Sequence, residues 1–405
     1  MNILTVSQNY FVRGGSDRYF FGLNKLLREK GHQVIPFAGA SEKNLPSEWA
    51  GFFPKAIDVK QPKTLELPSY FYNRNARKQL QRLLELNKID IAHLNIYYGV
   101  LTSSILKELK SHNIPIVQTL HEYKLACPVY TCYRDQTLCT QCSDFRYYHA
   151  IKNRCNSNSI VKSTVSALES YISRALGSEQ LIDQFITVSE FQRSILSGMG
   201  VPQDKMRTIH NFVDSEAFVD QSCKNKEGFL FAGRIELSKG VEDLIRLASS
   251  HQNTNFVVAG DGSAMPWLKE QIAQRKLSNI KIMGFLSQAE LKKAISEAKA
   301  CLVLSIWPEP FGLAVTESYA AGTPVVAYAN GGPAELVQHG KTGFLVQPGN
   351  LGELGDAIAM LEDDSDLAIE MGSEAQKIVR NNFSTDSYYD QLMQVYKRSL
   401  GGQHA

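Results

Sequence analysis

Short apolar runs alternate with segments of helical periodicity along this chain, and the whole alternation occurs twice. In the first half the apolar runs lie at 3–6, 34–37, 89–94, 114–120 and 185–188. In the second half they lie at 229–233, 256–260, 280–283, 301–305 and 325–328, with helical segments near 240–250, 264–276, 288–299 and 312–321. Strands that alternate with helices form parallel sheets covered by helices. We therefore predict an α/β protein with two Rossmann-like doubly wound domains.

The length of the chain, 405 residues, suits two domains better than one. We place an N-terminal domain at 1–209, with a Cys-rich inserted loop at about 124–165, and a second domain at 210–383. The last predicted helix, about Thr385 to Ser399, has no strand after it, so we expect residues 384–405 to pack back on the N-terminal domain. Ligands of doubly wound sheets bind outside the carboxyl ends of the strands. We therefore expect the two domains to face each other across a cleft that holds the active site.

The sequence contains no apolar run near the roughly 18 residues of a membrane span, and its start lacks a basic leader with a cleavage site. These features predict a cytoplasmic protein. Residues 1–210 hold 26 Lys and Arg against 17 Asp and Glu, whereas residues 211–405 hold 17 against 24. The basic half indicates an anionic partner, or else chance surface composition.

A basic amphipathic segment runs from Tyr70 to Lys88. Apolar residues at helical spacing accompany five cations, which are Arg74, Arg77, Lys78, Arg82 and Lys88. Such a helix can rest on the inner face of an anionic membrane, which would make the protein peripheral there. The same pattern is typical of an ordinary surface helix. Nothing in the chain indicates a nucleic-acid partner.

The strongest chemical signal is the run from Glu309 through Phe311, Gly312 and Leu313 to Glu317. The Phe-Gly turn follows a predicted strand and opens a helix, whose first amides form a natural anion site. The two carboxylates lie on either side of that turn. We predict that a diphosphate rests at the helix start, while the carboxylates hold sugar hydroxyls.

A second signal, Gly233-Arg234-Ile235-Glu236-Leu237-Ser238-Lys239-Gly240, directly follows another predicted strand. Arg234 can hold phosphate oxygens bidentately, and Lys239 can place a compact charge beside it. Two fixed cations would stabilise the charge that develops when a diphosphate leaves a sugar.

Weaker signals lie at the ends of other predicted strands. Gly14-Gly15 follows the first strand and permits close approach of a ligand, and Ser16 is predicted to cap the next helix. His121 ends a strand as well, although a lone His is more often structural. Gly331-Gly332-Pro333-Ala334-Glu335 opens a short helix in the second half.

Three of these motifs together resemble the retaining GT-B glycosyltransferases of family four, the glycosyl transferases group 1. They are Gly-Arg-x-x-x-x-Lys-Gly at 233–240, Glu-Pro-Phe-Gly-Leu-x-x-x-Glu at 309–317 and the Gly-Gly-x-x-Glu turn at 331–335. The resemblance extends over the whole chain. Within the family, the chain is similar to bacterial polysaccharide transferases. It implies a metal-independent hexosyltransferase that moves a sugar from a UDP- or GDP-sugar to a glycan or a polyprenyl-diphosphate-linked acceptor. Surface polysaccharide biosynthesis is the implied role.

The resemblance also implies roles for individual residues. Arg234 and Lys239 would bind the donor diphosphate, Glu309 the transferred sugar and Glu317 the ribose. Backbone near Gly284-Phe285 would hold the base, and His121 would lie beside the sugar and the acceptor. The remaining donor-side positions are Gly14, Gly15, Gly233, Phe311, Gly312 and Leu313. No cofactor or catalytic metal is implied.

Five of the seven cysteines, Cys127, Cys132, Cys139, Cys142 and Cys155, lie in one stretch. In a cytosolic protein such a group indicates a structural zinc site before it indicates disulfides. Free thiols that pack as small hydrophobic groups are the alternative. We expect this loop to shape the acceptor side, because it follows His121.

Two other functions fit the same fold. A sugar-nucleotide epimerase would act on the donor without an acceptor. An inactive nucleotide-sugar-binding module would bind the donor without turnover, although the complete set of Arg234, Lys239, Glu309 and Glu317 speaks against it.

Overall fold

The computed structural model describes residues 1–55, 67–214 and 226–401, and it divides into two compact units. Unit 1 comprises Met1–Arg134, Cys139–Ile209 and Tyr389–Ala405, and unit 2 comprises His210–Tyr388 with Asp135–Leu138. The chain therefore enters unit 2 after Ile209 and returns to unit 1 at Tyr389. No helix in the described ranges is long and apolar enough to cross a membrane.

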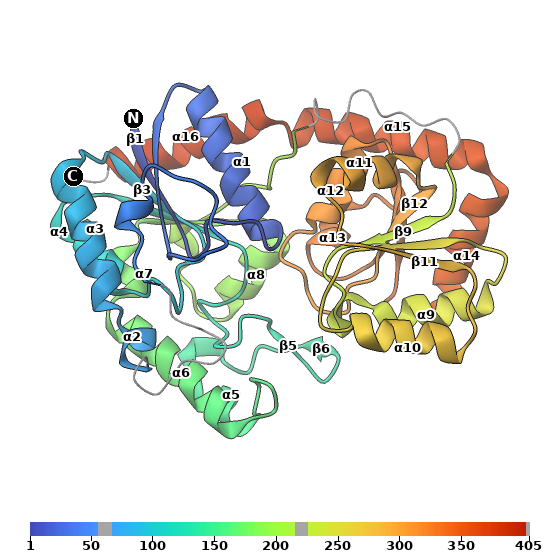
Figure 1. Ribbon diagram of the computed structural model, residues 1–405, viewed down its shortest axis with the longest axis horizontal. Helices are drawn as coiled ribbons and strands as arrows, with labels where there is room; N and C mark the ends of the chain where they lie inside the picture. Colours follow the sequence, from blue (N-terminus) through green and yellow to red (C-terminus); the bar gives the residue numbers. More distant parts are fainter. Residues whose placement is uncertain (56–66, 215–225, 402–405) are drawn as a thin grey trace. The chain divides into compact units, whose positions relative to one another are not determined.

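Unit 1 is built on a parallel sheet in the order β2-β1-β3-β4-β7-β8 (Figure 1). The strands are β1 (Asn2–Ser7), β2 (Gln33–Ala38), β3 (Ile91–Leu94), β4 (Ile116–Leu120), β7 (Gln184–Thr187) and β8 (Met206–Thr208). Every residue of the central strands β3 and β4 is buried, including the polar residues His93, Gln118 and Thr119, as expected for a sheet covered on both faces. The short strand β8 carries an Arg between a Met and a Thr, and its composition gave no signal of a strand.

Nine α-helices of unit 1 lie within the described ranges. They are α1 (Gly15–Glu29), α2 (Leu67–Phe71), α3 (Arg74–Leu86), α4 (Ser104–Ser111), α5 (Tyr148–Lys152), α6 (Ile160–Ala175), α7 (Ser178–Leu181), α8 (Glu190–Gly198) and α16 (Thr385–Gly401). The predicted cap of α1 is wrong. Gly14 is the N-cap, and Ser16 lies inside the first turn. The helix begins before Ser16, and the Arg18 amide that a Ser16 cap would bind donates to the Gly14 carbonyl at 3.1 Å.

The terminal helix α16 belongs to the core of unit 1. The hydroxyl of Tyr396 lies 2.6 Å from Nδ1 of His93, a fully buried residue of β3 whose Nε2 lies 2.8 Å from the Thr119 hydroxyl. At the start of the unit 1 segment of α16, the Tyr389 hydroxyl lies 2.8 Å from Nε2 of His32. A fully buried and a half-buried His of unit 1 thus find hydrogen-bond partners on α16.

The predicted inserted loop, 124–165, contains more regular structure than expected. It forms a small hairpin, β5 (Tyr133–Arg134) with β6 (Thr137–Leu138), and the short helix α5. Helix α6 begins within this segment, at Ile160, where the Ser159 side chain accepts from the Lys162 amide. The many Ser residues of this helix concealed its periodicity.

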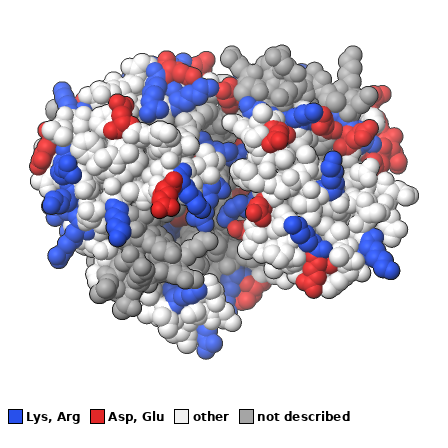
Figure 2. All heavy atoms as spheres, in the orientation of Figure 1, with Lys and Arg blue, Asp and Glu red and all other residues white. Residues whose placement is uncertain are grey.

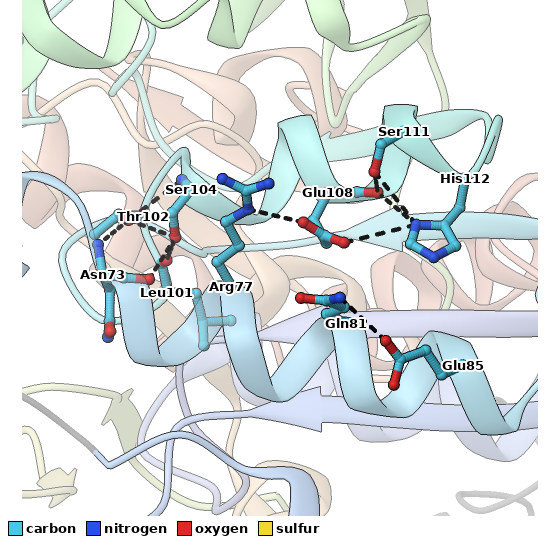
Figure 3. Close-up of polar contacts among 10 residues, drawn as sticks. All are labelled: Asn73, Arg77, Gln81, Glu85, Leu101, Thr102, Ser104, Glu108, Ser111 and His112. Carbon is cyan, nitrogen blue, oxygen red and sulfur yellow. Dashed lines mark hydrogen bonds and ion pairs between the residues drawn. The ribbon is translucent and has the colours of Figure 1, made fainter.

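The basic segment from Tyr70 to Lys88 forms two helices, α2 and α3, which Asn73 separates as the N-cap of α3. The apolar face of α3 is buried within unit 1, since Ala76, Leu80 and Leu83 have no exposed surface. Figure 3 shows Arg77 of α3 directed at Glu108 of α4, with Nε 2.8 Å from Oε2. The apolar face of α3 is therefore packed against the rest of unit 1, as in an ordinary surface helix.

Unit 2 has a second six-stranded parallel sheet, in the order β11-β10-β9-β12-β13-β14. The strands are β9 (Phe229–Ala232), β10 (Phe256–Ala259), β11 (Ile280–Gly284), β12 (Ala300–Val303), β13 (Val325–Tyr328) and β14 (Gly343–Val346). Five of these strands match predicted runs. The sixth, β14, was not predicted, because it starts at Gly343 and its apolar run is reduced to Phe344-Leu345-Val346.

Seven α-helices of unit 2 lie within the described ranges: α9 (Val241–Ser250), α10 (Met265–Gln274), α11 (Gln288–Glu297), α12 (Leu313–Ala320), α13 (Gly332–Leu336), α14 (Leu351–Asp363) and α15 (Ser365–Asn382). Figure 1 shows α9 and α10 on one side of this sheet and α11 and α12 on the other. The core between the layers is apolar and buried, and it includes Phe229, Leu244 and Leu302. This is the doubly wound architecture that the sequence predicted.

Candidate functional site

The sheet of unit 2 has a switch point between β9 and β12. The chain runs outward from β9 to β10 and β11, and in the opposite direction from β12 to β13 and β14. Doubly wound sheets bind ligands at the carboxyl ends of the strands that flank such a point. The loop after β9 carries Arg234 and Lys239, and the loop after β12 carries Glu309. The two strongest sequence signals therefore lie on the two loops of this switch point.

Lys239 and Glu309 form an ion pair across the switch point. Nζ of Lys239 lies 2.6 Å from Oε1 of Glu309, and their side chains are only 18% and 14% exposed. The Ser305 hydroxyl donates to the same carboxylate oxygen. Burial alone would raise the pKa of Glu309, but Lys239, Ser305 and the nearby charge of Arg234 together lower it below its usual value. Glu309 is thus held as a carboxylate.

Two glycines allow the backbone around this pair to approach closely. Gly240 has a φ of +80°, and a Cβ there would lie 2.0 Å from the carbonyl oxygen of Leu304. Gly331 has a φ of +69°, and a Cβ there would lie 2.5 Å from the carbonyl oxygen of Glu309. The Gly332 amide donates to that same oxygen at 2.7 Å. Glycine at these positions lets the loops after β9, β12 and β13 meet.

Arg234 lies on the same loop as Lys239, two residues after the end of β9. Its side chain is 54% exposed, and Nη1 lies 2.9 Å from Oε1 of Glu236. The preceding Gly233 has a φ of +143°. The Lys239 ammonium also lies 5.3 Å from the centre of the Trp307 ring. One exposed guanidinium and one enclosed ammonium therefore flank the carboxylate of Glu309.

The amino-terminal end of α12 lies directly after this cluster. Gly312 is the N-cap with a φ of +102°, and Leu313 is the first helical residue. First-turn amides of a helix point away from its body and attract anions. Glu317 lies on the second turn of α12 and is half-buried. The predicted turn that opens a helix is therefore present at the predicted residues.

Phe311 is buried in an aromatic cluster. Its ring centre lies 5.9 Å from that of His210 and 6.2 Å from that of Phe383. His210 Nε2 in turn lies 2.6 Å from Oε1 of Glu335, the last residue of the Gly-Gly-x-x-Glu turn. Packing fixes Phe311, and the cluster ties α13 to the start of unit 2. The sequence gave no signal that His210 and Glu335 pair.

The positions predicted to hold a base lie at the end of edge strand β11. Gly284 has a φ of +71°, and its carbonyl oxygen accepts from the Gly260 amide at 2.7 Å. Phe285 has 76% of its surface exposed. A large aromatic ring with this much exposed surface is available to cover a ligand.

His121 lies in unit 1, at the carboxyl end of β4. Its Nε2 lies 2.9 Å from Oδ1 of Asn95, which follows β3, and its ring packs edge-on against Tyr19 at 4.7 Å. The Asn95 amide nitrogen donates to the Val6 carbonyl at 3.3 Å, which turns Oδ1 toward the imidazole. Burial lowers the pKa of His121 to about 3. The imidazole is therefore neutral, carries its proton on Nε2 and presents the lone pair of Nδ1.

The Gly14-Gly15 loop of unit 1 is organised by Asp17. The amides of Arg13 and Gly14 both donate to Oδ2 of Asp17 at 3.0 Å. Burial raises the pKa of Asp17, while these amides oppose that effect. In this structure a side chain of the protein already binds the Gly14 amide that we expected to meet a ligand.

Sequence reasoning missed three polar residues that support these sites: Ser305, Asn330 and Asn95. The Asn330 side chain donates to the Ile306 carbonyl at 2.9 Å and so holds the loop that carries Glu309. All three lie one or two residues after the end of a parallel strand, as His121 does. Their position at strand ends is the signal that could have identified them.

The five clustered cysteines line one cavity of unit 1, together with Met199 and other residues. All five are free thiols. Hydrogen bonding from Cys132 lowers the pKa of Cys127 to about 6, which suits a metal-binding thiolate. However, within residues 1–55, 67–214 and 226–401, no three His, Cys, Asp or Glu side chains converge closely enough to hold a metal ion. Zinc in this cavity stays a prediction.

Two protein-family models match the sequence of this chain. Residues 13–217 match the model of Glycosyltransferase Family 4, and residues 214–378 match that of Glycosyl transferases group 1. The chain therefore belongs to Glycosyltransferase Family 4. Curated relatives include a glycogen synthase of Mycobacterium tuberculosis, 30% identical over 59% of this chain and 58% of its own length. Another is the alpha-D-kanosaminyltransferase of Streptomyces kanamyceticus, 32% identical over 42% and 45%. The alignments thus span less than two thirds of these relatives.

Solved structures share the fold over almost the entire chain. Sucrose-phosphate synthase from Thermosynechococcus elongatus superposes with a TM-score of 0.75 at 19% identity and covers 99% of both chains. Anabaena Alr3699/HepE in complex with UDP-glucose superposes with a TM-score of 0.72 at 19% identity, covering 98% of this chain and all of the other. The fold is thus GT-B, with two Rossmann-like doubly wound domains.

Proposed function

We propose that this chain is a retaining glycosyltransferase that moves a hexose from a nucleotide diphosphate sugar to a glycan or a lipid-linked acceptor. The observation that carries the proposal is the ion pair between Lys239 and Glu309 at the switch point of unit 2. It places a cation for a phosphate and a carboxylate for sugar hydroxyls side by side, at the edge of the sheet where ligands bind.

In this proposal the donor lies along the carboxyl ends of the unit 2 strands. Arg234 and Lys239 bind the diphosphate with the first amides of α12, and Glu309 binds the sugar. Glu317 binds the ribose, and the base lies against the backbone at Gly284 and the exposed ring of Phe285. When the diphosphate binds, Lys239 interacts with both the diphosphate and Glu309, so donor binding weakens the ion pair between Lys239 and Glu309.

The fixed cations supply the electrostatic stabilisation of the leaving diphosphate, so the proposed reaction needs no metal. As the resemblance to retaining family-four transferases implies, we propose a front-face displacement in which the leaving phosphate accepts the proton of the acceptor. His121 would accept a hydrogen bond on Nδ1 from a sugar or acceptor hydroxyl. Retention of anomeric configuration follows from this geometry of attack.

The nature of the donor and acceptor is inferred from chemistry and from relatives. HepE binds UDP-glucose in a solved complex, which supports a UDP-sugar here, with a GDP-sugar as the alternative. The basic balance of residues 1–210 suits an anionic acceptor such as a sugar on polyprenyl diphosphate. A role in surface polysaccharide biosynthesis would supply that acceptor.

The first experiment measures binding of UDP, GDP, ADP, CMP and their sugar conjugates by thermal shift in EDTA, with ligand at about 100 times its dissociation constant, which adds about 2.7 kcal/mol. We expect a shift with one nucleotide. Lys239→Met should remove most of it, whereas the control Lys341→Met, an exposed lysine of the same unit, should retain it.

The second experiment tests the reaction. Glu309→Gln should bind the nucleotide at least as tightly as the wild type, because Lys239 no longer carries a competing carboxylate, yet it should not transfer sugar. NMR of the product anomeric carbon should show retention. Conversion of the donor without an acceptor would instead identify an epimerase. Binding without turnover in the wild type, with a broad set of acceptors, would identify a binding module.

A further inference from the structure

Helix α6 buries its polar face and exposes its apolar face, which is the reverse of an ordinary surface helix. The residues that face the interior of unit 1 are small or polar: Ser163, Ser166, Ala167, Glu169, Ser170 and Ser173. Most of the residues that face outward are apolar, and the exposed fractions of Ile160, Val161, Leu168 and Tyr171 are 51%, 73%, 44% and 38%. Val161 and Leu168 are seven residues apart, and the half-buried Val165 lies between them on the same helical face.

Buried polar contacts fix this orientation. Nζ of Lys124 lies 2.6 Å from Oε2 of Glu169, and both side chains are less than 10% exposed. The same ammonium donates to the Pro128 carbonyl at 2.8 Å. The Ser173 hydroxyl lies 2.5 Å from that of Ser103. Rotating α6 to hide its apolar face would break these bonds and leave a buried carboxylate unpaired, which is costly. The apolar face is therefore held outward by the fold.

Helix α5 extends this face. Tyr148 is 50% exposed, and its amide donates to the Tyr171 hydroxyl of α6 at 3.1 Å. We define the α5–α6 surface as the exposed apolar residues Tyr148, Ile160, Val161, Leu168 and Tyr171 with the exposed cations Lys152, Arg154 and Lys162.

The charges on the α5–α6 surface have one sign. Between Tyr148 and Ala175 the sequence has four basic residues and a single acidic one, and that residue, Glu169, is buried in its ion pair with Lys124. No acidic residue of this stretch is exposed, whereas Lys152, Arg154 and Lys162 are. Figure 2 shows blue Lys and Arg spheres among white ones on the lobe that carries α5 in Figure 1.

We propose that the α5–α6 surface docks unit 1 onto an anionic lipid bilayer. Apolar side chains with aromatic residues at their edge enter the boundary between headgroups and acyl chains, while cations around them meet the lipid phosphates. A second copy of the chain fits this surface less well, because a twofold contact would bring Lys152, Arg154 and Lys162 of both copies together. The inference does not depend on the proposed reaction.

Vesicle sedimentation of the full-length protein, without nucleotide or acceptor, tests this proposal. We expect binding to vesicles of phosphatidylcholine with about 30% phosphatidylglycerol, and little to pure phosphatidylcholine. Val161→Ser with Leu168→Ser should lower the partition coefficient about tenfold or more. The matched control is Leu86→Ser, since Leu86 is 72% exposed on α3 of the same unit, and it should bind like the wild type.

The cations have a matched control of their own. Lys152→Gln, Arg154→Gln and Lys162→Gln should each weaken binding about fivefold at low salt, whereas Arg74→Gln and Lys78→Gln on α3 should change it less than about twofold. Equal binding to neutral vesicles, no binding to either kind, or full binding by the α5–α6 variants with unchanged melting temperature would overturn the proposal. So would a dimer in light scattering that Val161→Ser with Leu168→Ser dissociates, since the face would then join two copies.

Discussion

The ion pair between Lys239 and Glu309 can be tested by a double-mutant cycle on stability. Both side chains are enclosed, at 18% and 14% exposure, and the atoms lie 2.6 Å apart. Removing one partner of a buried pair leaves a charge without its counterion and costs 3–5 kcal/mol. Because this pair keeps some contact with solvent, we expect Lys239→Met and Glu309→Gln to cost about 3 kcal/mol each. The double variant should cost about 4 kcal/mol, which corresponds to a coupling of about 2 kcal/mol.

The assay must report on unit 2 alone, because a protein with two units need not unfold in one step. The chain has three tryptophans, and in a Trp49→Phe background the remaining two, Trp267 and Trp307, both lie in unit 2. Urea unfolding followed by tryptophan fluorescence then yields the four free energies of the cycle. A coupling below about 0.5 kcal/mol would refute the pair, because independent residues are additive within that margin.

The pH dependence offers a second check on the same pair. Burial opposes the charge of Glu309, but Lys239 and Ser305 outweigh it, and its pKa is lower in the folded protein than the usual 4.5. The unfolded state therefore binds the proton first as pH falls. The stability contributed by the carboxylate is fully present above the unfolded pKa and is lost as pH falls through the folded one. We expect the difference between wild type and Glu309→Gln to be constant near neutral pH and to shrink only below about pH 4.5.

Three further predictions follow from other parts of the structure. Gly240→Ala should destabilise unit 2 by at least about 2 kcal/mol more than Gly349→Ala in the same urea assay. Both glycines have a positive φ, but only a Cβ at Gly240 would collide with backbone atoms. Equal costs would show that the loops move to accommodate the added Cβ. In nitrogen NMR the ring of His121, with its pKa lowered by burial to about 3, should remain neutral and protonated on Nε2 down to about pH 4; titration near pH 6.5 would contradict the burial of the ring, and a neutral ring protonated on Nδ1 would contradict the contact with Asn95. Elemental analysis decides the zinc prediction: one zinc per chain that is lost in Cys139→Ser with Cys142→Ser but kept in Cys301→Ser would establish it, and metal-free protein would exclude it.

The sequence predicted the layers of the fold well because buried parallel strands are continuous apolar runs. It failed where a strand is short or polar, as in β8, and where a helix contradicts the usual pattern. Helix α6 is the clearest example, since its apolar residues face outward and its Ser residues face inward. Periodicity identifies that two faces exist, but only tertiary contacts such as the one between Lys124 and Glu169 decide which face is buried.

For the candidate site, the sequence predicted residues but not their pairing. Arg234, Lys239 and Glu309 could be found because they follow strands that end at one edge of a sheet. Two contacts depend on loop conformations that the spacing of residues in the sequence does not specify. They are the ion pair of Lys239 with Glu309 and the hydrogen bond of Asp17 with the Gly14 amide. Such contacts lie between residues 70 and 3 positions apart, respectively, and only the folded backbone brings the distant pair together.

The return of the chain to unit 1 through α16 has a consequence for synthesis on the ribosome. His32 and His93 find their tyrosine partners at Tyr389 and Tyr396, respectively. All of unit 2 is translated before those residues, so unit 1 cannot complete its interior while unit 2 can. The order of maturation should therefore invert the order of translation, with the half that begins the polypeptide finishing last. Until then the nascent chain exposes the α16 docking face, where a chaperone could bind.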